Sequence, residues 1–323
     1  MKRVIVTGGT GFVGANLTRW LLRDGHEVHL LVRPEHAAWR IEEIRRDVRL
    51  HRLELSDAQA VSKAVEEIKP EWIFHLAAHG AYSWQADIAQ IFQTNLLGTI
   101  QLVEACLKTG FESFIHTGSS SEYGFKDHAP GEAEGLEPNS HYAVAKASAT
   151  LYCRYTAQAR KANLTTLRLY SVYGPYEEAK RLMPTLIRHG LRGEWPPLVS
   201  PDTARDYVYV EDVCDACILA ARTAPREFGA VYNVGTGKQT TLREVTEIAR
   251  GVLGIEAEPQ WGTMPARTWD TATWRADNRK IQAELGWQPR HSFEAGFSRM
   301  VSRQRNRLEQ EAQVEVTKNH HQT

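Results

Sequence analysis

Two kinds of apolar pattern alternate along the first half of this chain. Short apolar runs predict buried strands, and they fall at residues 3–7, 28–32, 48–53, 72–77, 113–117 and 165–170. Between them, apolar residues recur every three or four positions, as in Val13, Leu17 and Leu21, and similar stretches predict helices over 58–68 and 91–109. This alternation predicts an α/β fold, a doubly wound parallel Rossmann sheet that binds ligands at the carboxyl ends of its strands.

The alternation stops after residue 175. Residues 176–206 contain four prolines and predict an irregular segment, followed by a late strand at 231–234 and helices at 241–253 and 279–285. We therefore expect a cofactor-binding Rossmann domain over 1–175, to which segments near 207–235 return, and a smaller C-terminal substrate lobe over 176–310. The polar residues 309–323 show no apolar period and predict disorder, so that 311–323 form a tail outside both domains.

The charge of the chain is balanced, with 39 basic and 39 acidic residues. No net field would draw it to nucleic acid or to an anionic membrane, so placed cations must bind any phosphate. No apolar run reaches the length of a membrane span and no signal sequence precedes the first strand, so we expect a cytoplasmic protein. Cys214 and Cys217 form a CxxC inside a predicted helix, where we expect packed thiols and no metal.

A glycine-rich segment joins the first strand to the first helix. Gly8, Gly11 and Gly14 have the spacing of a dinucleotide-binding turn, and Gly9 offers a second register with the last two. In such a turn one glycine makes the tight bend, one lets the backbone approach the pyrophosphate, and one lets the helix pack closely on the strand. The sequence therefore predicts a dinucleotide at the N-terminus of this helix.

The residue that follows the second strand bears on the choice of cofactor. A carboxylate at this place would hold the adenosine ribose hydroxyls of NAD, but the residue here is Arg33. A guanidinium suits a 2′-phosphate, so NADP is favoured. The alternative is that Arg33 is a solvated surface residue and that the cofactor is NAD. Phe12 and Val13, which open the first helix, are expected to belong to the same cofactor site.

Tyr142 and Lys146 are four residues apart in a predicted helix and share one of its faces. The ordinary pKa of tyrosine is about 10, and we expect the Lys146 ammonium to lower it by stabilising the phenolate. Lys146 can also reach the nicotinamide ribose, and Ser119 can share the substrate oxygen with Tyr142. These three residues predict a set that moves a proton while a hydride moves at the same carbon. His75 and His79 are expected to be packing and loop residues.

Taken together, these motifs resemble the extended short-chain dehydrogenase/reductase family. More closely, they are similar to its branch that acts on nucleotide-activated sugars, which contains 4-epimerases, 4,6-dehydratases and 4-keto reductases. The resemblance covers roughly residues 1–300. It rests on Gly8-x-x-Gly11-x-x-Gly14, His75-Leu76-Ala77-Ala78, Asn95, Ser119 with Tyr123-Gly124, Tyr142-x-x-x-Lys146, Arg205-Asp206-Tyr207-Val208 and Leu285-Gly286-Trp287-x-Pro289.

The resemblance implies further contacts with the cofactor. Glu54 and Leu55 fall where the family contacts adenine, and Ala77 and Ala78 fall where it lines the cofactor. Asn95 falls beside the site. All five residues are therefore expected at the cofactor, together with the glycine turn and the catalytic pair.

The resemblance also implies a nucleotide-diphosphate sugar as the substrate. Arg205 and Arg267 fall at positions that meet the substrate diphosphate in the family, and a guanidinium can bind a phosphate with two parallel hydrogen bonds. The alternative for each arginine alone is a surface salt bridge. Ser120 and Ser171 are expected to line the same substrate site.

A homodimer is implied as well, in which residues 91–109 and the catalytic helix pack against their two-fold mates. For this contact the catalytic helix offers Ala143, Ala147, Leu151 and Tyr155 at helical spacing. The alternative is that this face packs only on its own sheet.

The chain departs from the family pattern at two places. After the catalytic serine, 4,6-dehydratases carry an acidic pair or at least a glutamate two residues on, whereas Ser120 and Ser121 stand here and Glu122 comes one place late. Dehydration is therefore disfavoured. Ser171 replaces an asparagine that is common in sugar-nucleotide epimerases, which weakens any inference of uridine specificity.

Two enzymatic reactions and one alternative without catalysis remain. The Arg33 signal favours a reductase that uses NADPH to reduce a 4-keto-6-deoxy sugar nucleotide at C4. The alternative reaction is 4-epimerisation with tightly held NAD. A cofactor-binding regulator without turnover is disfavoured because Ser119, Tyr142 and Lys146 are all present.

Overall fold

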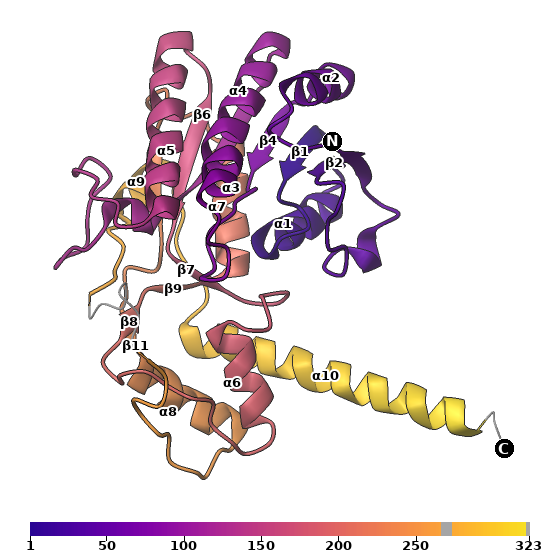
Figure 1. Ribbon diagram of the computed structural model, residues 1–323, viewed down its shortest axis with the longest axis vertical. Coiled ribbons are helices and arrows are strands. Elements are labelled where there is room, and N and C mark those ends of the chain that lie inside the picture. Colours follow the sequence, from indigo (N-terminus) through magenta and orange to yellow (C-terminus); the bar gives the residue numbers. More distant parts are fainter. Residues whose placement is uncertain (266–272, 321–323) are drawn as a thin grey trace.

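The protein is built around one parallel sheet (Figure 1). The computed structural model describes residues 1–265 and 273–320, with the backbone alone for 312 and 314–320. Seven strands are hydrogen-bonded in the order β10-β6-β5-β4-β1-β2-β3, and each pairing is parallel. The strands are β1 (Arg3–Thr7), β2 (Glu27–Val32), β3 (Arg49–Arg52), β4 (Trp72–His75), β5 (Ser113–Ser119), β6 (Leu164–Leu169) and β10 (Val231–Val234). This is the doubly wound α/β fold that the sequence predicted.

Helices cover both faces of this sheet. Successive residues of a strand face opposite sides, so β1 supplies Val4 and Val6 to one core and Ile5 to the other. The first core is completed by α1 and α7, and the second by α2, α4 and α5. The helices of this part are α1 (Phe12–Arg23), η1 (Glu42–Ile44), α2 (Ala58–Ile68), α3 (Ile88–Phe92), η2 (Gln93–Leu97), α4 (Gly98–Thr109), η3 (Ser120–Tyr123), α5 (His141–Arg160) and α7 (Val210–Arg222).

A smaller set of elements packs beyond the carboxyl ends of the strands, in the lower part of Figure 1. Its apolar cluster includes Met183, Leu186, Val245 and Phe297, which join three helices through one core. The elements are β7 (Ser171–Tyr173), α6 (Leu182–Gly190), β8 (Ala204–Arg205), β9 (Tyr207–Tyr209), β11 (Thr240–Thr241), α8 (Leu242–Leu253) and α10 (Phe293–His320). Two small sheets, β7 with β9 and β8 with β11, lie between this core and the large sheet. Between α8 and α10 the chain returns to the large sheet, where α9 (Arg279–Leu285) packs on β10 and adds Ile281 to the first core. The predicted domain boundaries near residues 175 and 310 stay a prediction.

The structure departs from the sequence prediction in two helices. The segment predicted to be irregular contains α6, because Pro184 lies in the first turn, where a missing N–H costs no intrahelical hydrogen bond. The predicted disordered tail is wrong over its described part, since α10 continues to His320. The chain has no glycine or proline after Gly296. The first turns of α10 pack in the apolar cluster through Phe297 and Met300, and ion pairs such as Arg307 with Glu311 at 3.2 Å support the polar part that follows.

No helix in the described part of the chain is both long enough and apolar enough to cross a bilayer.

Candidate active site

The glycine turn makes a cradle at the carboxyl edge of the sheet. Gly8 has φ +68°, and a Cβ there would lie 2.7 Å from the backbone nitrogen of Ala77. A Cβ on Gly14 would lie 2.1 Å from the Gly8 carbonyl oxygen, so α1 can approach the turn only without a side chain. Gly11 caps α1 without a side-chain hydrogen bond, which leaves N–H groups of the first turn directed at this space. The cradle fits the pyrophosphate of a dinucleotide.

The other predicted cofactor residues follow successive strands of the same edge. Arg33 comes directly after β2 and is exposed, and Glu54, two residues after β3, is exposed as well. Leu55 packs near Gly98, whose added Cβ would lie 3.0 Å from the Leu55 Cβ. Ala78 is exposed two residues beyond Leu76, beside the glycine turn. These placements are compatible with the predicted contacts, which stay predictions.

Asn95 acts on the loop after β4 rather than facing open space. Its side chain is fully buried, accepts a hydrogen bond from the His79 N–H at 2.9 Å and donates one to the His79 carbonyl at 2.7 Å. It therefore fixes the backbone that follows Ala77 and Ala78.

His75 is a packing residue, as the sequence predicted. Its ring is hydrogen-bonded to Thr7 at 2.7 Å and to Thr99 at 2.8 Å, which ties β4 to β1 and α4. Burial lowers the pKa of His75 to about 3, with a further contribution from Lys146. The imidazole is therefore neutral at physiological pH.

The three predicted catalytic residues come together at the end of β5. Tyr142 and Lys146 lie one turn apart on α5, whose first turn is capped by Ser140 accepting from the Ala143 N–H at 3.1 Å. Ser119 is the last residue of β5. Its hydroxyl is hydrogen-bonded to the Ser121 hydroxyl at 2.8 Å and lies near enough to the Tyr142 phenol to lower the pKa of that phenol. The substrate oxygen predicted between these two groups would thus find both of them in one place.

The pKa values in this set differ from the sequence prediction. Burial raises the pKa of Tyr142 to about 12, although the Ser119 hydroxyl lowers it. Burial also lowers the pKa of Lys146 to about 8. The expectation that Lys146 lowers the pKa of Tyr142 below its ordinary value is wrong for the protein alone, because the loss of solvent raises the pKa by more than the neighbouring groups lower it. Tyr142 is consequently a neutral proton donor at pH 7.

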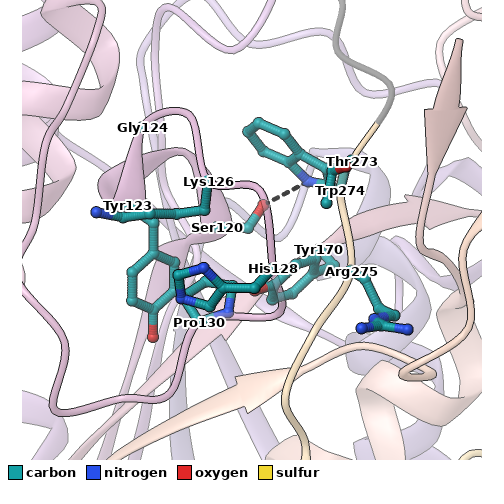
Figure 2. A pocket seen from close by; sticks show the side chains of 10 residues that line it. All are labelled: Ser120, Tyr123, Gly124, Lys126, His128, Pro130, Tyr170, Thr273, Trp274 and Arg275. Carbon is teal, nitrogen blue, oxygen red and sulfur yellow. Dashed lines mark hydrogen bonds between the residues drawn. The ribbon is translucent and has the colours of Figure 1, made fainter.

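The substrate side of the site contains a cavity that the sequence did not predict (Figure 2). The Trp274 indole points into it and donates a hydrogen bond to the Ser120 Oγ at 3.1 Å. The Tyr170 hydroxyl is buried here without a hydrogen-bond partner among the described residues. Trp274 and Tyr170 were missed because nothing in the local sequence connects them with Ser120, which is more than a hundred residues from Trp274.

One of the two predicted substrate arginines, Arg205, borders the cavity. Arg205 in β8 lies with its guanidinium carbon 5.3 Å from the centre of the Trp274 ring, so it borders the same cavity residue. Ser171 begins β7, and its N–H donates to the Asp206 carbonyl at 3.0 Å. Arg267 lies outside the described residues.

Asp206 was also missed as a residue that builds the site. Its buried carboxylate accepts hydrogen bonds from the Thr236 hydroxyl and the backbone N–H groups of Thr236, Gly237 and Ala276. These bonds, 2.7 to 3.0 Å long, fasten the segment that carries Trp274 to the strand that carries Arg205. The signal was present in the Arg-Asp-Tyr segment, but its partners lie far along the chain.

The CxxC cysteines belong to the core. Cys214 and Cys217 lie in α7, are buried as free thiols and pack in the cluster beneath α1. Burial raises the pKa of both. Among the described residues, no group of three or more potential ligands is arranged to hold a metal ion.

Comparison with known proteins identifies the family. The family described as "NAD dependent epimerase/dehydratase family" matches residues 4–235. The chain belongs to this family. It is an enzyme of the extended short-chain dehydrogenase/reductase type, as the motifs predicted, and the glycine turn and the three predicted catalytic residues lie in the matched region.

Relatives of known activity are similar over nearly the whole chain. UDP-glucose 4-epimerase of Mycolicibacterium smegmatis is 32% identical over 94% of this chain and 99% of that protein. The crystal structure of UDP-glucose 4-epimerase with UDP-glucose from Thermotoga maritima matches with a TM-score of 0.85, at 28% identity, over 94% of this chain and 99% of the other. The UDP-glucose 4-epimerase of Thermus thermophilus in complex with NAD matches with a TM-score of 0.81, at 29% identity, over 93% of this chain and 98% of the other.

Proposed function

We propose that this protein is a nucleotide-sugar 4-epimerase that holds NAD through its catalytic cycle. The observation that carries the proposal is the contact of Ser119 with Tyr142, one turn before Lys146 and at the same sheet edge as the glycine cradle. The relatives support it, because both solved structures and the curated relative described above are UDP-glucose 4-epimerases. The sequence alone favoured the reductase, whereas the epimerase agrees at least as well with these relatives.

The residues of the site divide the reaction between them. When bound, the nicotinamide supplies the acceptor for the hydride of C4 and, in its oxidised form, a positive charge. Ser119 donates to the C4 oxygen and Tyr142 exchanges a proton with it, as base while C4 is oxidised and as acid when the hydride returns to the opposite face. A positive charge beside Tyr142 favours its phenolate and offsets the effect of burial. Lys146 would hold the nicotinamide ribose and add to that charge.

The substrate is proposed to be a nucleotide-diphosphate sugar. Arg205, together with the predicted Arg267, would bind the diphosphate, and Ser120 and Trp274 would face the sugar. Because the indole of Trp274 occupies the space beside Ser120, we expect it to limit the size of the sugar that the site accepts.

The two positions after Ser119, where 4,6-dehydratases of this family carry acidic residues, have no acid here. Positions 120 and 121 are serines, and the Ser121 hydroxyl is hydrogen-bonded to Ser119 at 2.8 Å. Glu122 points into the protein, where its side chain is fully buried in an ion pair with Arg168. Elimination of water requires an acid and a base at the sugar, so the proposal excludes a 4,6-dehydratase.

A second candidate is the NADPH-dependent 4-keto reductase, which Arg33 favours. This residue is exposed at the end of β2, where its guanidinium could meet a 2′-phosphate. For this candidate, Arg33→Asp should turn the preference from NADPH towards NADH, since a carboxylate repels the phosphate and accepts from the ribose hydroxyl. Equal use of both cofactors by the two proteins would remove the support of Arg33 for the reductase.

Two assays separate the candidates. Nucleotides released from the purified protein are identified by mass spectrometry, and UDP-glucose and related sugar nucleotides are tested for C4 inversion without added cofactor. The epimerase predicts NAD in the released fraction and turnover in this assay. Oxidation of added NADPH with a 4-keto sugar nucleotide, without any inversion activity, would establish the reductase instead.

A further inference from the structure

A buried carboxylate lies directly beneath the catalytic residues. Glu122 is completely inaccessible to solvent, and both of its oxygens are occupied. Oε1 accepts from the Ser119 backbone N–H at 2.8 Å and from the Thr150 hydroxyl at 3.0 Å. Oε2 accepts from the Arg168 Nε at 2.8 Å. One side chain thus connects the end of β5, the catalytic helix α5 and strand β6.

We propose that Glu122 is a positioning residue, which holds Ser119 in register with α5 through its bonds to the Ser119 N–H and the Thr150 hydroxyl and so places a negative charge beside the turn of α5 that carries Lys146. The inference rests on the proposed function and deepens it, because it assigns the control of the same catalytic set. It also gives a role to the acid that stands one place late in the Ser-Ser-Ser-Glu segment.

The hydrogen bonds explain how Glu122 sets the geometry. The bond to the Ser119 N–H fixes the residue that contacts Tyr142, and the bond to Thr150 fixes α5 one turn after Lys146. Because both bonds end on the same oxygen, a displacement of β5 relative to α5 would break at least one of them. Leaving such a buried group without a partner is costly, so the two elements are held together.

Glu122 is the anion that acts on Lys146, because the other ionisable groups described around this ammonium are neutral. Of the described groups that interact with this ammonium, His75 and His116 are neutral because burial lowers the pKa of both. Cys153 on α5 is also neutral, since burial raises the pKa of its thiol. Tyr142, on the same helix, has a pKa of about 12 and is protonated as well. Glu122 raises the pKa of Lys146 and so offsets part of the effect of burial.

Arg168 fixes the position of the Glu122 carboxylate. Its side chain is 3% exposed, and its Nη1 donates to the Tyr123 hydroxyl at 2.8 Å, which in turn donates to Asn233 at 2.8 Å. Such a partner offsets the cost of removing a carboxylate from water. The structure therefore provides an anion that is fixed, paired and directed at the catalytic helix.

The test measures the pH at which Lys146 loses its proton. For each background, the free energy of unfolding is compared with that of the same protein carrying Lys146→Met, from pH 6 to 10. In the parent, the difference between the two proteins should change above a pH of about 8. In Glu122→Gln, this change should begin at a pH lower by about 1 unit or more, because a neighbouring opposite charge has been removed.

Glu132→Gln is the matched control. Glu132 accepts from the Asn233 N–H at 2.8 Å in the same polar region but touches neither Ser119 nor Thr150 in the described contacts. In Glu132→Gln, the difference in unfolding free energy should begin to change at the same pH as in the parent. If Glu122→Gln fails to fold because Arg168 has lost its partner, the double variant Glu122→Gln/Arg168→Gln replaces the ion pair by two neutral amides. The same shift to lower pH is expected there.

The inference is overturned if the difference in unfolding free energy begins to change at the same pH in Glu122→Gln as in the parent. If the single variant does not fold, the same result in the double variant overturns it. The alkaline limb of kcat/KM for epimerisation should move to lower pH with the same variants. Absence of epimerisation in the parent protein would reject the proposed function, whereas the unfolding measurements would still decide the role of Glu122.

Discussion

At the scale of single residues, burial determines the protonation of the catalytic set. Tyr142 has a pKa of about 12 and Lys146 a pKa of about 8, each moved by desolvation toward its neutral form. The protein without cofactor is therefore prepared to donate a proton from Tyr142. The phenolate required by the oxidative half of an epimerase cycle depends on charges that arrive with the cofactor.

Replacing the proton carrier tests this assignment. Tyr142→Phe should reduce kcat roughly 10²- to 10⁴-fold, the usual contribution of a positioned acid or base. Binding of NAD, followed by fluorescence titration, should be nearly unchanged, because the proposed partner of the phenol is the substrate oxygen and not the cradle at Gly8 and Gly14. Near-parental turnover of the variant would show that another group carries the proton.

Lys146 should leave a signature in the stability of the protein without cofactor. Its pKa falls from 10.5 in the unfolded chain to about 8 in the folded one, so between these values the unfolded state binds more protons and stability rises with pH. The whole rise corresponds to about 3 kcal/mol, at about 1.4 kcal/mol for each pKa unit. Urea unfolding at pH 7.5 and 10 should show it in the parent but not in Lys146→Met. A pH-independent difference between the two proteins would argue against a buried ammonium.

At the scale of elements, the features that could be predicted from the sequence are those that depend on the spacing of neighbouring residues. The glycine turn, the Tyr142–Lys146 pair and all seven strands of the large sheet could be predicted because their signals lie within a few neighbouring residues. Glu122, Asp206 and Trp274 could not, since each acts through partners far away in the sequence, such as Arg168 for Glu122. The path of α10 to His320 was missed because a polar helix has no apolar period to detect.

The start of α5 offers a test at this scale, because Tyr142 lies in its first turn. Ser140 caps this turn by accepting from the Ala143 N–H. Ser140→Ala should lower the free energy of unfolding by about 1 kcal/mol, the typical value of an N-cap. It should also reduce kcat, since the turn that carries Tyr142 loses its fixed end. Ser140→Asp, which can make the same bond, is the control and should retain both stability and activity; a loss equal to that of alanine would separate activity from the cap.

At the scale of the whole molecule, the surface of α5 bears on assembly. Two of the four residues predicted for the dimer face, Ala143 and Ala147, do not lie on the surface, because they are buried within the protein itself. The exposed apolar side chains of this helix are instead Val144, Leu151 and Tyr155, at 36%, 57% and 72% exposure. Their spacing of seven and four residues places them on one face. Such a stripe of apolar residues on a rigid helix is a characteristic interaction surface.

We predict that this stripe forms a two-fold interface in which α4 and α5, which lie side by side in Figure 1, pack against the same helices of a second copy. The parent should have the mass of a dimer by light scattering at micromolar concentration. Leu151→Glu with Tyr155→Glu should produce monomers, because an isologous contact would bring each new charge against the apolar stripe of the partner. Leu308→Glu, the same change on exposed α10, is the matched control and should remain dimeric. A monomeric parent would remove the dimer prediction, and a dimer that survives both substitutions would place the interface elsewhere on the molecule.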